Sequence, residues 1–169
     1  MSHLRSQLLS RDALFEILDT VKDPEVPVLS VVELGIIRDV EHTDAGVVVT
    51  ITPTYSGCPA MHEIEEEIRR ALAQHDVGPV QIRTTYAPAW TSDWIGPGAR
   101  AKLEAYGIAP PGPADTNELI PLRRRASTVR CPYCKSMHTE LKSTFGSTAC
   151  KSIWVCNGCR QPFEEFKAI

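Results

Sequence analysis

The chain has 169 residues, a formal net charge of −3, 43% hydrophobic residues and 23% charged residues. This composition is typical of a globular protein with room for one modest domain and a small appendage. No apolar run approaches the roughly 18 residues of a membrane span. The first 14 residues have neither a continuous apolar core nor a small-residue cleavage site, so we expect a cytoplasmic protein with no signal peptide and no membrane partner.

Charge is distributed unevenly along the chain. Residues 1–120 carry 9 Lys and Arg against 18 Asp and Glu, whereas residues 121–169 carry 9 against 3. The two parts therefore have net charges of −9 and +6, which sum to −3. An acidic body followed by a basic part predicts two units. The basic unit could bind nucleic acid, an acidic protein or its own acidic neighbour.

The first third of the chain predicts a helix followed by a β-hairpin. Ser10 can cap a helix whose apolar residues recur at helical spacing up to Val21, and Pro24 ends that helix. Residues 30–42 and 46–54 are rich in β-branched residues and are separated by a turn sequence, which predicts two paired strands.

A second helix is predicted directly after a lone cysteine. Cys58 is followed by Pro59, which suits the first helical position, and by an apolar stripe with glutamates on the opposite face. Residues 80–88 predict a third strand, and residues 91–107 a turn and a short helix that ends at Gly107. The order α-β-β-α-β-α predicts a small α/β domain with a mixed sheet.

The domain organisation follows from a change in composition after this helix. Residues 108–128 are rich in proline and polar residues and show no periodicity, which predicts a linker. We therefore expect an α/β domain over residues 1–107 and a cysteine-rich unit over residues 129–169. The predicted fold class is α+β, with a C-terminal zinc β-ribbon.

The zinc prediction rests on two C-x-x-C pairs separated by 21 residues, Cys131, Cys134, Cys156 and Cys159. This spacing suits two turns that close on one tetrahedral ion. About 40 residues rarely bury enough apolar surface to fold unaided, and structural zinc contributes on the order of 10–16 kcal/mol in zinc-finger peptides. We predict a structural zinc. Disulfides, a redox pair, and an iron or cluster site with the same thiolates are the alternatives, and a ligand exchange with Cys150 is kept as a further one.

Cys58 is predicted to be the reactive thiol of the chain. A cysteine at a helix start faces unpaired backbone N–H groups and the positive end of the helix dipole, so its pKa should fall below the free value of about 8.5. The thiolate is the form that ligates iron or attacks a substrate, and His62 could support it from one turn away. The alternative is that Cys58 fills a corner of the core, while Asp23 and Glu25 cap and solvate a turn.

Three short motifs resemble the hallmarks of the family of small iron–sulfur assembly proteins that includes SufT and the eukaryotic cytosolic targeting factor. They are Asp23-Pro24-Glu25, Leu34-Gly35-Ile36 and Cys58-Pro59, and the match covers about residues 10–90. The resemblance implies that Cys58 transiently holds iron or an iron–sulfur cluster, or touches a client at its metal site. It also implies that Asp23 and Glu25 assist.

A second resemblance covers nearly the whole chain. The stretch YAPAWTSDWIGPGARAKLEAYGIAPP, followed by CPYC, FGSTACK, CNGC and PFEEFK, resembles the D-subunit family of phenylacetyl-CoA epoxidase (ring 1,2-epoxidase) systems, called PaaD or PaaJ. It implies a non-catalytic accessory subunit in aerobic phenylacetate catabolism, with a di-iron oxygenase and an iron–sulfur reductase as partners. The sequence agrees in one respect, because it has no Glu-x-x-His motif of a di-iron helix bundle.

Three other functions are compatible with the residues. The chain could be a constitutive structural subunit, a thiol redox enzyme that acts through Cys58, or a zinc ribbon that binds nucleic acid. The last would use Arg123–Arg125 together with Arg130, Lys135 and Lys142, but the acidic body opposes it electrostatically. We therefore expect no nucleic-acid partner. A homo-oligomer is compatible with the sequence.

Overall fold

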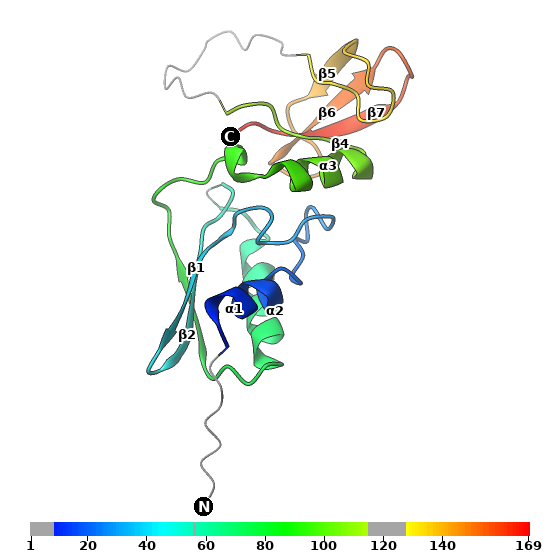
Figure 1. Cartoon of the computed structure of the whole chain (residues 1–169). Coiled ribbons are helices and arrows are strands. Elements are labelled where there is room, and N and C mark those ends of the chain that lie inside the picture. Colours follow the sequence, from blue (N-terminus) through cyan, green and yellow to red (C-terminus); the bar gives the residue numbers. More distant parts are fainter. Residues whose placement is uncertain (1–8, 56, 115–127) are drawn as a thin grey trace, which may run out of the picture. The chain divides into compact units, whose positions relative to one another are not determined.

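The computed structural model describes residues 9–55, 57–114 and 128–169 (Figure 1). The chain divides into two compact units, residues 1–89 and 90–169. Both combine helices with a sheet, so the predicted α+β class is confirmed. None of the described helices is long and apolar enough to cross a membrane.

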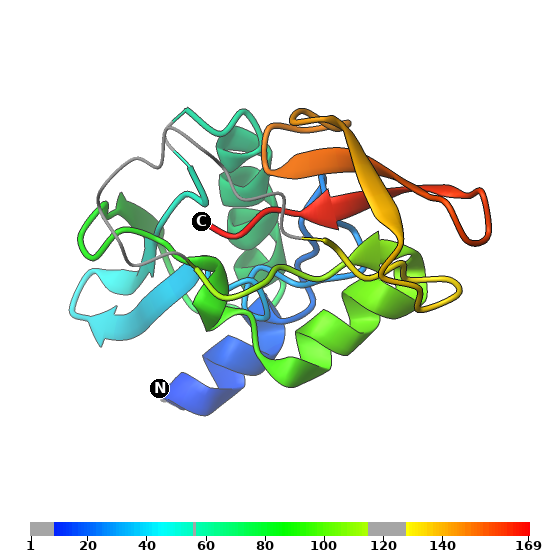
Figure 2. The same ribbon diagram turned by 90° about the horizontal axis from the view of Figure 1, so that it is seen from above.

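The first unit is a three-stranded sheet with two helices on one of its faces (Figures 1 and 2). The sheet has the order β1-β2-β3, in which β2 pairs antiparallel with β1 and parallel with β3. This mixed pairing agrees with the sequence prediction. In chain order the elements are α1 (Arg11–Leu18), β1 (Ile37–Thr43), β2 (Gly46–Ile51), α2 (Met61–Ala73) and β3 (Val80–Thr84).

The core of this unit lies between the helices and the sheet. Ser10 caps α1 as predicted, since its Oγ accepts a hydrogen bond of 3.1 Å from the Ala13 N–H. Every residue of the apolar stripes that face the core is at most 1% exposed, and full burial of such a side chain contributes about 1.5–3 kcal/mol. These residues are Leu14 and Leu18 of α1, Ile64, Ile68 and Leu72 of α2, and Val47, Val49 and Ile51 of β2.

The segment before β1 differs from its prediction. Ser30 forms an isolated antiparallel β-bridge with Lys22, and residues 31–35 form turns instead of the first half of a strand, which begins only at Ile37. Ser30 and Glu33 form a capping box, in which each backbone N–H donates to the side chain of the other residue at 3.0 Å. The buried Ser30 hydroxyl also donates to Asp19. These local bonds hold a turn where the β-branched residues predicted a strand.

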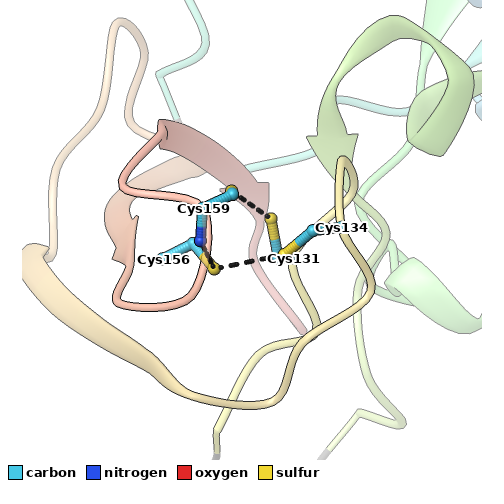
Figure 3. Close-up of side chains that lie close together, drawn as sticks. All are labelled: Cys131, Cys134, Cys156 and Cys159. Atoms are coloured by element: carbon cyan, nitrogen blue, oxygen red, sulfur yellow. Dashed lines mark hydrogen bonds between the residues drawn. The ribbon is translucent and has the colours of Figure 1, made fainter.

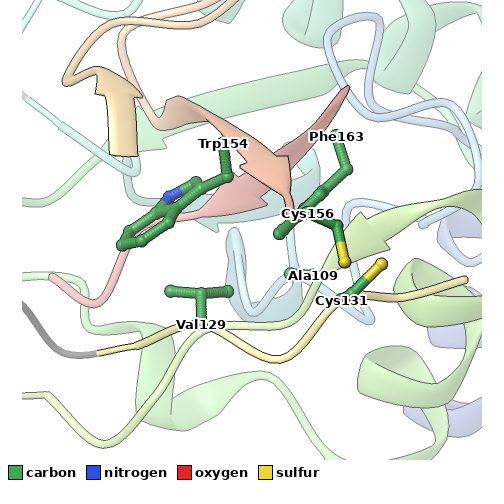
Figure 4. Close-up of a cluster of buried hydrophobic side chains, with 6 residues drawn as sticks. All are labelled: Ala109, Val129, Cys131, Trp154, Cys156 and Phe163. Atoms are coloured by element: carbon green, nitrogen blue, oxygen red, sulfur yellow. The ribbon is translucent and has the colours of Figure 1, made fainter. Parts of the chain in front are cut away.

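The second unit is a four-stranded sheet with α3 beside it (Figure 1). The sheet order is β4-β7-β6-β5, with β4 parallel to β7 and the other pairs antiparallel. A small buried cluster fills its interior, formed by Ala109, Val129, Cys131, Trp154, Cys156 and Phe163 (Figure 4). The elements are the 3₁₀ helix η1 (Ser92–Trp94), α3 (Pro97–Tyr106), β4 (Ile108–Ala109), β5 (Thr139–Ser143), β6 (Lys151–Cys156) and β7 (Pro162–Phe166).

The predicted domain boundary after residue 107 and the linker over 108–128 are corrected by this arrangement. The chain divides after residue 89, so α3 belongs to the second unit, and β4 lies inside the predicted linker. The left-handed Gly107, with φ of 94°, ends α3 and turns the chain at once into β4. Residues 115–127 of the predicted linker, including Arg123–Arg125, lie outside the described residues.

One arginine fixes α3 within this unit. The Arg100 guanidinium donates to the carbonyl oxygens of Ile95 at 2.8 Å and Ser92 at 3.0 Å, and also to the carbonyl oxygen of Pro111. These bonds join η1, α3 and the chain after β4. Apolar patterning cannot reveal such contacts, because each acceptor is a backbone atom.

Candidate metal centre and thiol site

The structure brings the sulfur atoms of four cysteines into one cluster (Figure 3). All four Sγ atoms lie within 4.8 Å of one another, with Cys131 and Cys159 at 3.8 Å and Cys134 and Cys156 at 3.5 Å. A tetrahedral zinc with Zn–S bonds of about 2.3 Å needs sulfur atoms roughly 3.8 Å apart. The donor set therefore fits a structural metal ion. Four sulfur ligands would complete the tetrahedral shell and leave no position for a substrate.

Two equivalent backbone turns position these thiols. In the first turn the Lys135 N–H donates to the Cys131 carbonyl at 3.0 Å, and in the second the Arg160 N–H donates to the Cys156 carbonyl at 2.8 Å. Lys135 and Arg160 both have left-handed backbones, with φ of 65° and 64°. The C-x-x-C pattern predicts the turns, but a basic residue at a left-handed position could not be expected from its side chain.

The four thiols differ in exposure. Cys131 and Cys156, the first cysteine of each turn, are fully buried, whereas Cys159 is half-buried and Cys134 is exposed. The turns lie close together at Gly158, where an added Cβ atom would meet the Ser136 Cβ at 3.3 Å and the Cys156 Sγ at 3.5 Å. Glycine at this position leaves room for the facing turn.

Backbone N–H groups prepare one of the buried sulfurs for ionisation. The Cys159 N–H donates to the Cys156 Sγ at 3.5 Å and, with further help from the Cys134 thiol and the Gly158 N–H, lowers the pKa of Cys156 to about 6. The pKa of Cys159 shifts in the opposite direction. The Gln161 N–H lowers its pKa, but burial and the neighbouring thiols raise the pKa of Cys159 to about 12. A metal ion that binds here displaces the remaining protons.

Cys58 lies in a turn before α2 and outside the helix. The helix begins at Met61 with Ala60 as its N-cap, so Pro59 does not occupy the predicted first helical position. The half-buried Cys58 is held through its backbone, with its N–H donating to the Tyr55 carbonyl at 3.3 Å and its carbonyl accepting from the Met61 N–H at 3.3 Å.

The predicted lowering of the Cys58 pKa is wrong. Burial raises the pKa of this thiol, the Ala60 N–H partly opposes the rise, and the charges of Glu25 and Asp23 add to it. The two carboxylates therefore lie close enough to the sulfur for their charges to act on it. His62, which was expected to support a thiolate, is exposed.

The two carboxylates beside Cys58 have different surroundings. Asp23 is 5% exposed, and its Oδ1 accepts bonds of 2.8 Å from the N–H groups of Glu25 and Val26. It therefore caps the turn that carries Glu25. Among the described residues, the four ribbon cysteines are the group of three or more His, Cys, Asp or Glu side chains that lie close enough together to hold a metal ion. Cys58, Asp23 and Glu25 do not form a second such group.

The remaining thiol, Cys150, is 3% exposed and lies outside the ribbon cluster. Its Sγ is 3.1 Å from the Thr148 Oγ1. No disulfide bond joins any of the six cysteines, all of which lie among the described residues.

Comparison with known proteins shows which protein family the chain belongs to. Residues 115–167 match the PaaD zinc beta ribbon domain, and residues 11–84 match the iron–sulfur cluster assembly protein family. The chain is 44% identical over 156 residues to an Escherichia coli (strain K12) protein whose name describes it as the D-subunit of a 1,2-phenylacetyl-CoA epoxidase, with 92% of each chain covered. The chain belongs to the PaaD family. Both predicted family resemblances are thereby confirmed.

Shorter relatives of this PaaD-family chain are similar to part of it. A Porphyromonas gingivalis protein named "Fe-S protein maturation auxiliary factor" is 36% identical over 98 residues, which cover 57% of this chain and 92% of the relative. The crystal structure of a domain of unknown function from Bacillus anthracis is similar with a TM-score of 0.52 and 26% identity, over 55% of this chain and 90% of that one. These similarities agree with a separate first unit, the part of the chain that matches the iron–sulfur cluster assembly family.

Proposed function

We propose that the chain is a non-catalytic accessory factor of a phenylacetyl-CoA epoxidase system in the cytoplasm. In this proposal it assists the assembly of iron or an iron–sulfur cluster in the oxygenase or in its reductase. The observation that carries the proposal is the half-buried Cys58 beside Asp23 and Glu25, in a unit that matches an iron–sulfur cluster assembly family. The 44% identical relative is named as an epoxidase subunit, and this name is the reason for proposing the epoxidase system as the client.

The chemistry of the Cys58 site suits brief contact with iron better than storage. One sulfur is available there, whereas an iron–sulfur cluster takes four cysteine ligands. Ferrous iron can displace the thiol proton, and the charges of Glu25 and Asp23, which raise the pKa, also attract a divalent cation. The client's own side chains complete the coordination shell in this proposal, so the metal ends on the client.

The four-cysteine centre has a different role in this proposal. Cys131, Cys134, Cys156 and Cys159 hold zinc, which stabilises the small second unit. Because four thiolates complete the tetrahedral shell, the ion activates no water and takes no part in the transfer of iron.

The test is the metal content of the partners after co-expression. The oxygenase and reductase subunits are purified from cells that express the native chain, Cys58→Ser or Cys150→Ser, and their iron is measured by elemental analysis. We expect Cys58→Ser to lower the iron content and the epoxidase activity of the partners, and Cys150→Ser to leave both near the native level. Equal iron content of the partner subunits in all three preparations would show that Cys58 has no role in iron assembly.

The name of the Escherichia coli relative favours a second candidate, a constitutive structural subunit. The same preparations separate the two candidates. A structural subunit co-purifies with the oxygenase at fixed stoichiometry, and Cys58→Ser then changes neither the stoichiometry nor the iron content. A maturation factor is absent from the finished enzyme.

A further inference from the structure

The geometry points to an oxidant-sensitive release of the ribbon metal, in which the exposed Cys134 reacts first with a peroxide. Cys156 of the opposite turn then forms a disulfide with it. The inference concerns the second unit and does not depend on the function proposed for Cys58. It requires that one ligand be accessible while its partner sulfur is fixed nearby, and the cluster has both properties.

The exposures identify the first target. Cys131 and Cys156 are 0% exposed and belong to the buried cluster of the unit, so a peroxide reaches neither without unfolding (Figure 4). Cys159 is half-buried, and Cys134 is the exposed member of the four. The backbone around Cys134 is held from both sides, because the Lys135 Nζ donates to the Pro132 carbonyl and to Glu104 of α3, each at 2.6 Å. This exposure is therefore a feature of a fixed turn.

The distances identify the second sulfur. Each outer thiol lies beside the inner thiol of the other turn, with 3.5 Å between the sulfurs of Cys134 and Cys156 and 3.8 Å between those of Cys131 and Cys159 (Figure 3). A disulfide bond of about 2.05 Å requires the first pair to approach by roughly 1.5 Å. Both of these close sulfur pairs join the two turns, so we expect the disulfide to form between the turns.

The reaction balances with hydrogen peroxide as the oxidant. The Cys134 thiolate attacks one peroxide oxygen, the O–O bond breaks, and a sulfenic acid and hydroxide form. The Cys156 thiolate then attacks the Cys134 sulfur, the S–S bond forms and the second hydroxide leaves. The two sulfurs lose two electrons, which the two peroxide oxygens gain, and two metal ligands are lost. The remaining pair, Cys131 and Cys159, cannot retain zinc in a closed tetrahedral site.

Disulfide mapping tests the proposal, because trypsin separates the two turns. Cleavage after Arg130, Lys135, Lys151 and Arg160 places Cys131 and Cys134 in one peptide and Cys156 and Cys159 in another. The reduced native chain is loaded with Zn²⁺, treated with substoichiometric hydrogen peroxide, alkylated and digested. We expect the two peptides to be joined, with tandem mass spectra placing the bond between Cys134 and Cys156. A chromophoric chelator should detect one zinc released for each disulfide formed.

Two results would overturn the proposal. Separate peptides, each lighter by two hydrogens, would show disulfides within the turns, and a bond between Cys131 and Cys159 would show that exposure does not select the target. If the native chain takes up no zinc, the position of the first disulfide formed by peroxide still tests the predicted order of reaction of the cysteines. Cys58→Ser and Cys150→Ser are the matched controls, since we expect the same bond in both, and its loss in either would implicate that thiol in the relay.

Discussion

The environment of Cys58 makes it a weak nucleophile and a suitable cation contact. Its pKa is raised first by burial, and the charges of Glu25 and Asp23 add to the rise, so the thiol keeps its proton at neutral pH. A bound divalent cation reverses the effect of those charges, because carboxylates that repel a thiolate attract a metal ion. A redox enzyme needs the opposite arrangement, with a thiolate already present before the substrate arrives.

The pH dependence of Cys58 alkylation tests this environment. We expect iodoacetamide to modify Cys58 slowly at neutral pH, with a rate that rises at a more alkaline pH than for a cysteine in a short peptide. Glu25→Gln removes one of the charges that raise the pKa, so its profile should shift to lower pH. Mass spectrometry of the Cys58 peptide measures the rate at each pH. A profile that matches the short peptide, in the native chain and in Glu25→Gln alike, would contradict this account.

The same shift links the Cys58 thiol to stability. Because the folded chain holds the proton more tightly than the unfolded chain, this group contributes stability below the pKa of the unfolded thiol. That contribution is lost as the pH rises from the unfolded pKa towards the folded one. Neutral and mildly acidic solutions therefore retain it in full.

At the scale of elements, one glycine allows the first unit to form its mixed sheet. Gly46 begins β2 with a φ of 130°, and a Cβ atom at this position would lie 2.1 Å from the Pro79 carbonyl oxygen. That oxygen accepts a bond of 2.9 Å from the Val47 N–H, directly before the parallel pair Val47 and Val80. Residue 46 must therefore lack a side chain if β3 is to begin beside β2.

A Gly46→Ala substitution should destabilise the first unit. The strained backbone alone costs about 1–3 kcal/mol, and the clash with the Pro79 oxygen adds to it because a backbone atom would have to move. Urea unfolding followed by far-UV circular dichroism measures the loss. Gly98→Ala is the control, because this α3 glycine has open space around it and alanine is favoured in a helix by about 1 kcal/mol. Equal stability of the two variants would refute the steric argument.

The sequence predicts elements well where the determinants are local. Ser10 caps α1, Gly107 ends α3, and the C-x-x-C spacing predicts the two metal turns, because each signal acts within a few residues. Local bonding also explains a failure, since the Ser30 capping box replaces the first half of a predicted strand. Residue types alone did not show that this box would prevail over the β-branched run.

At the scale of the whole molecule, the two units should respond differently to loss of metal. The first unit has its own core of helix and sheet residues, whereas the buried cluster of the second unit includes two of the four cysteines, Cys131 and Cys156. Demetallation therefore removes a constraint from the centre of the second unit alone. The difference can be measured by tryptophan fluorescence, because all 3 tryptophans of the chain lie in the second unit. They are Trp90, Trp94 and Trp154.

Removal of the metal with a strong chelator under reducing conditions should unfold the second unit and spare the first. We expect tryptophan fluorescence to shift to the red, because Trp90 and Trp154 are 5% and 6% exposed when folded. The far-UV circular dichroism of α1 and α2 should persist and unfold in a separate transition on heating. Re-addition of Zn²⁺ should restore the fluorescence. An unchanged tryptophan spectrum after complete metal removal would contradict a stabilising role for the ion.

Relations between distant parts of the chain are what the sequence did not predict. Burial of the Cys58 thiol reversed the predicted direction of its pKa shift, and the charge of Glu25, which is distant in sequence, adds to the rise. The pairing of Ile108 with Glu164 joins a predicted linker to the ribbon, although residues 108–128 show no periodicity. Neither effect has a local signal. The four cysteines were found by spacing because their turns are local, and only their unequal exposure needed the structure.

The position of β4 has a consequence for any attempt to produce the ribbon as a fragment. β4 covers the edge of β7, with Ile108 and Ala109 opposite Glu164 and Glu165. A fragment that begins at residue 115, where the match to the ribbon family starts, lacks this strand. It would expose the backbone N–H and C=O groups of β7 as a template for other chains, and aggregation would follow even with the metal bound. The ribbon of this protein is therefore not a transplantable module unless residues 90–114 accompany it.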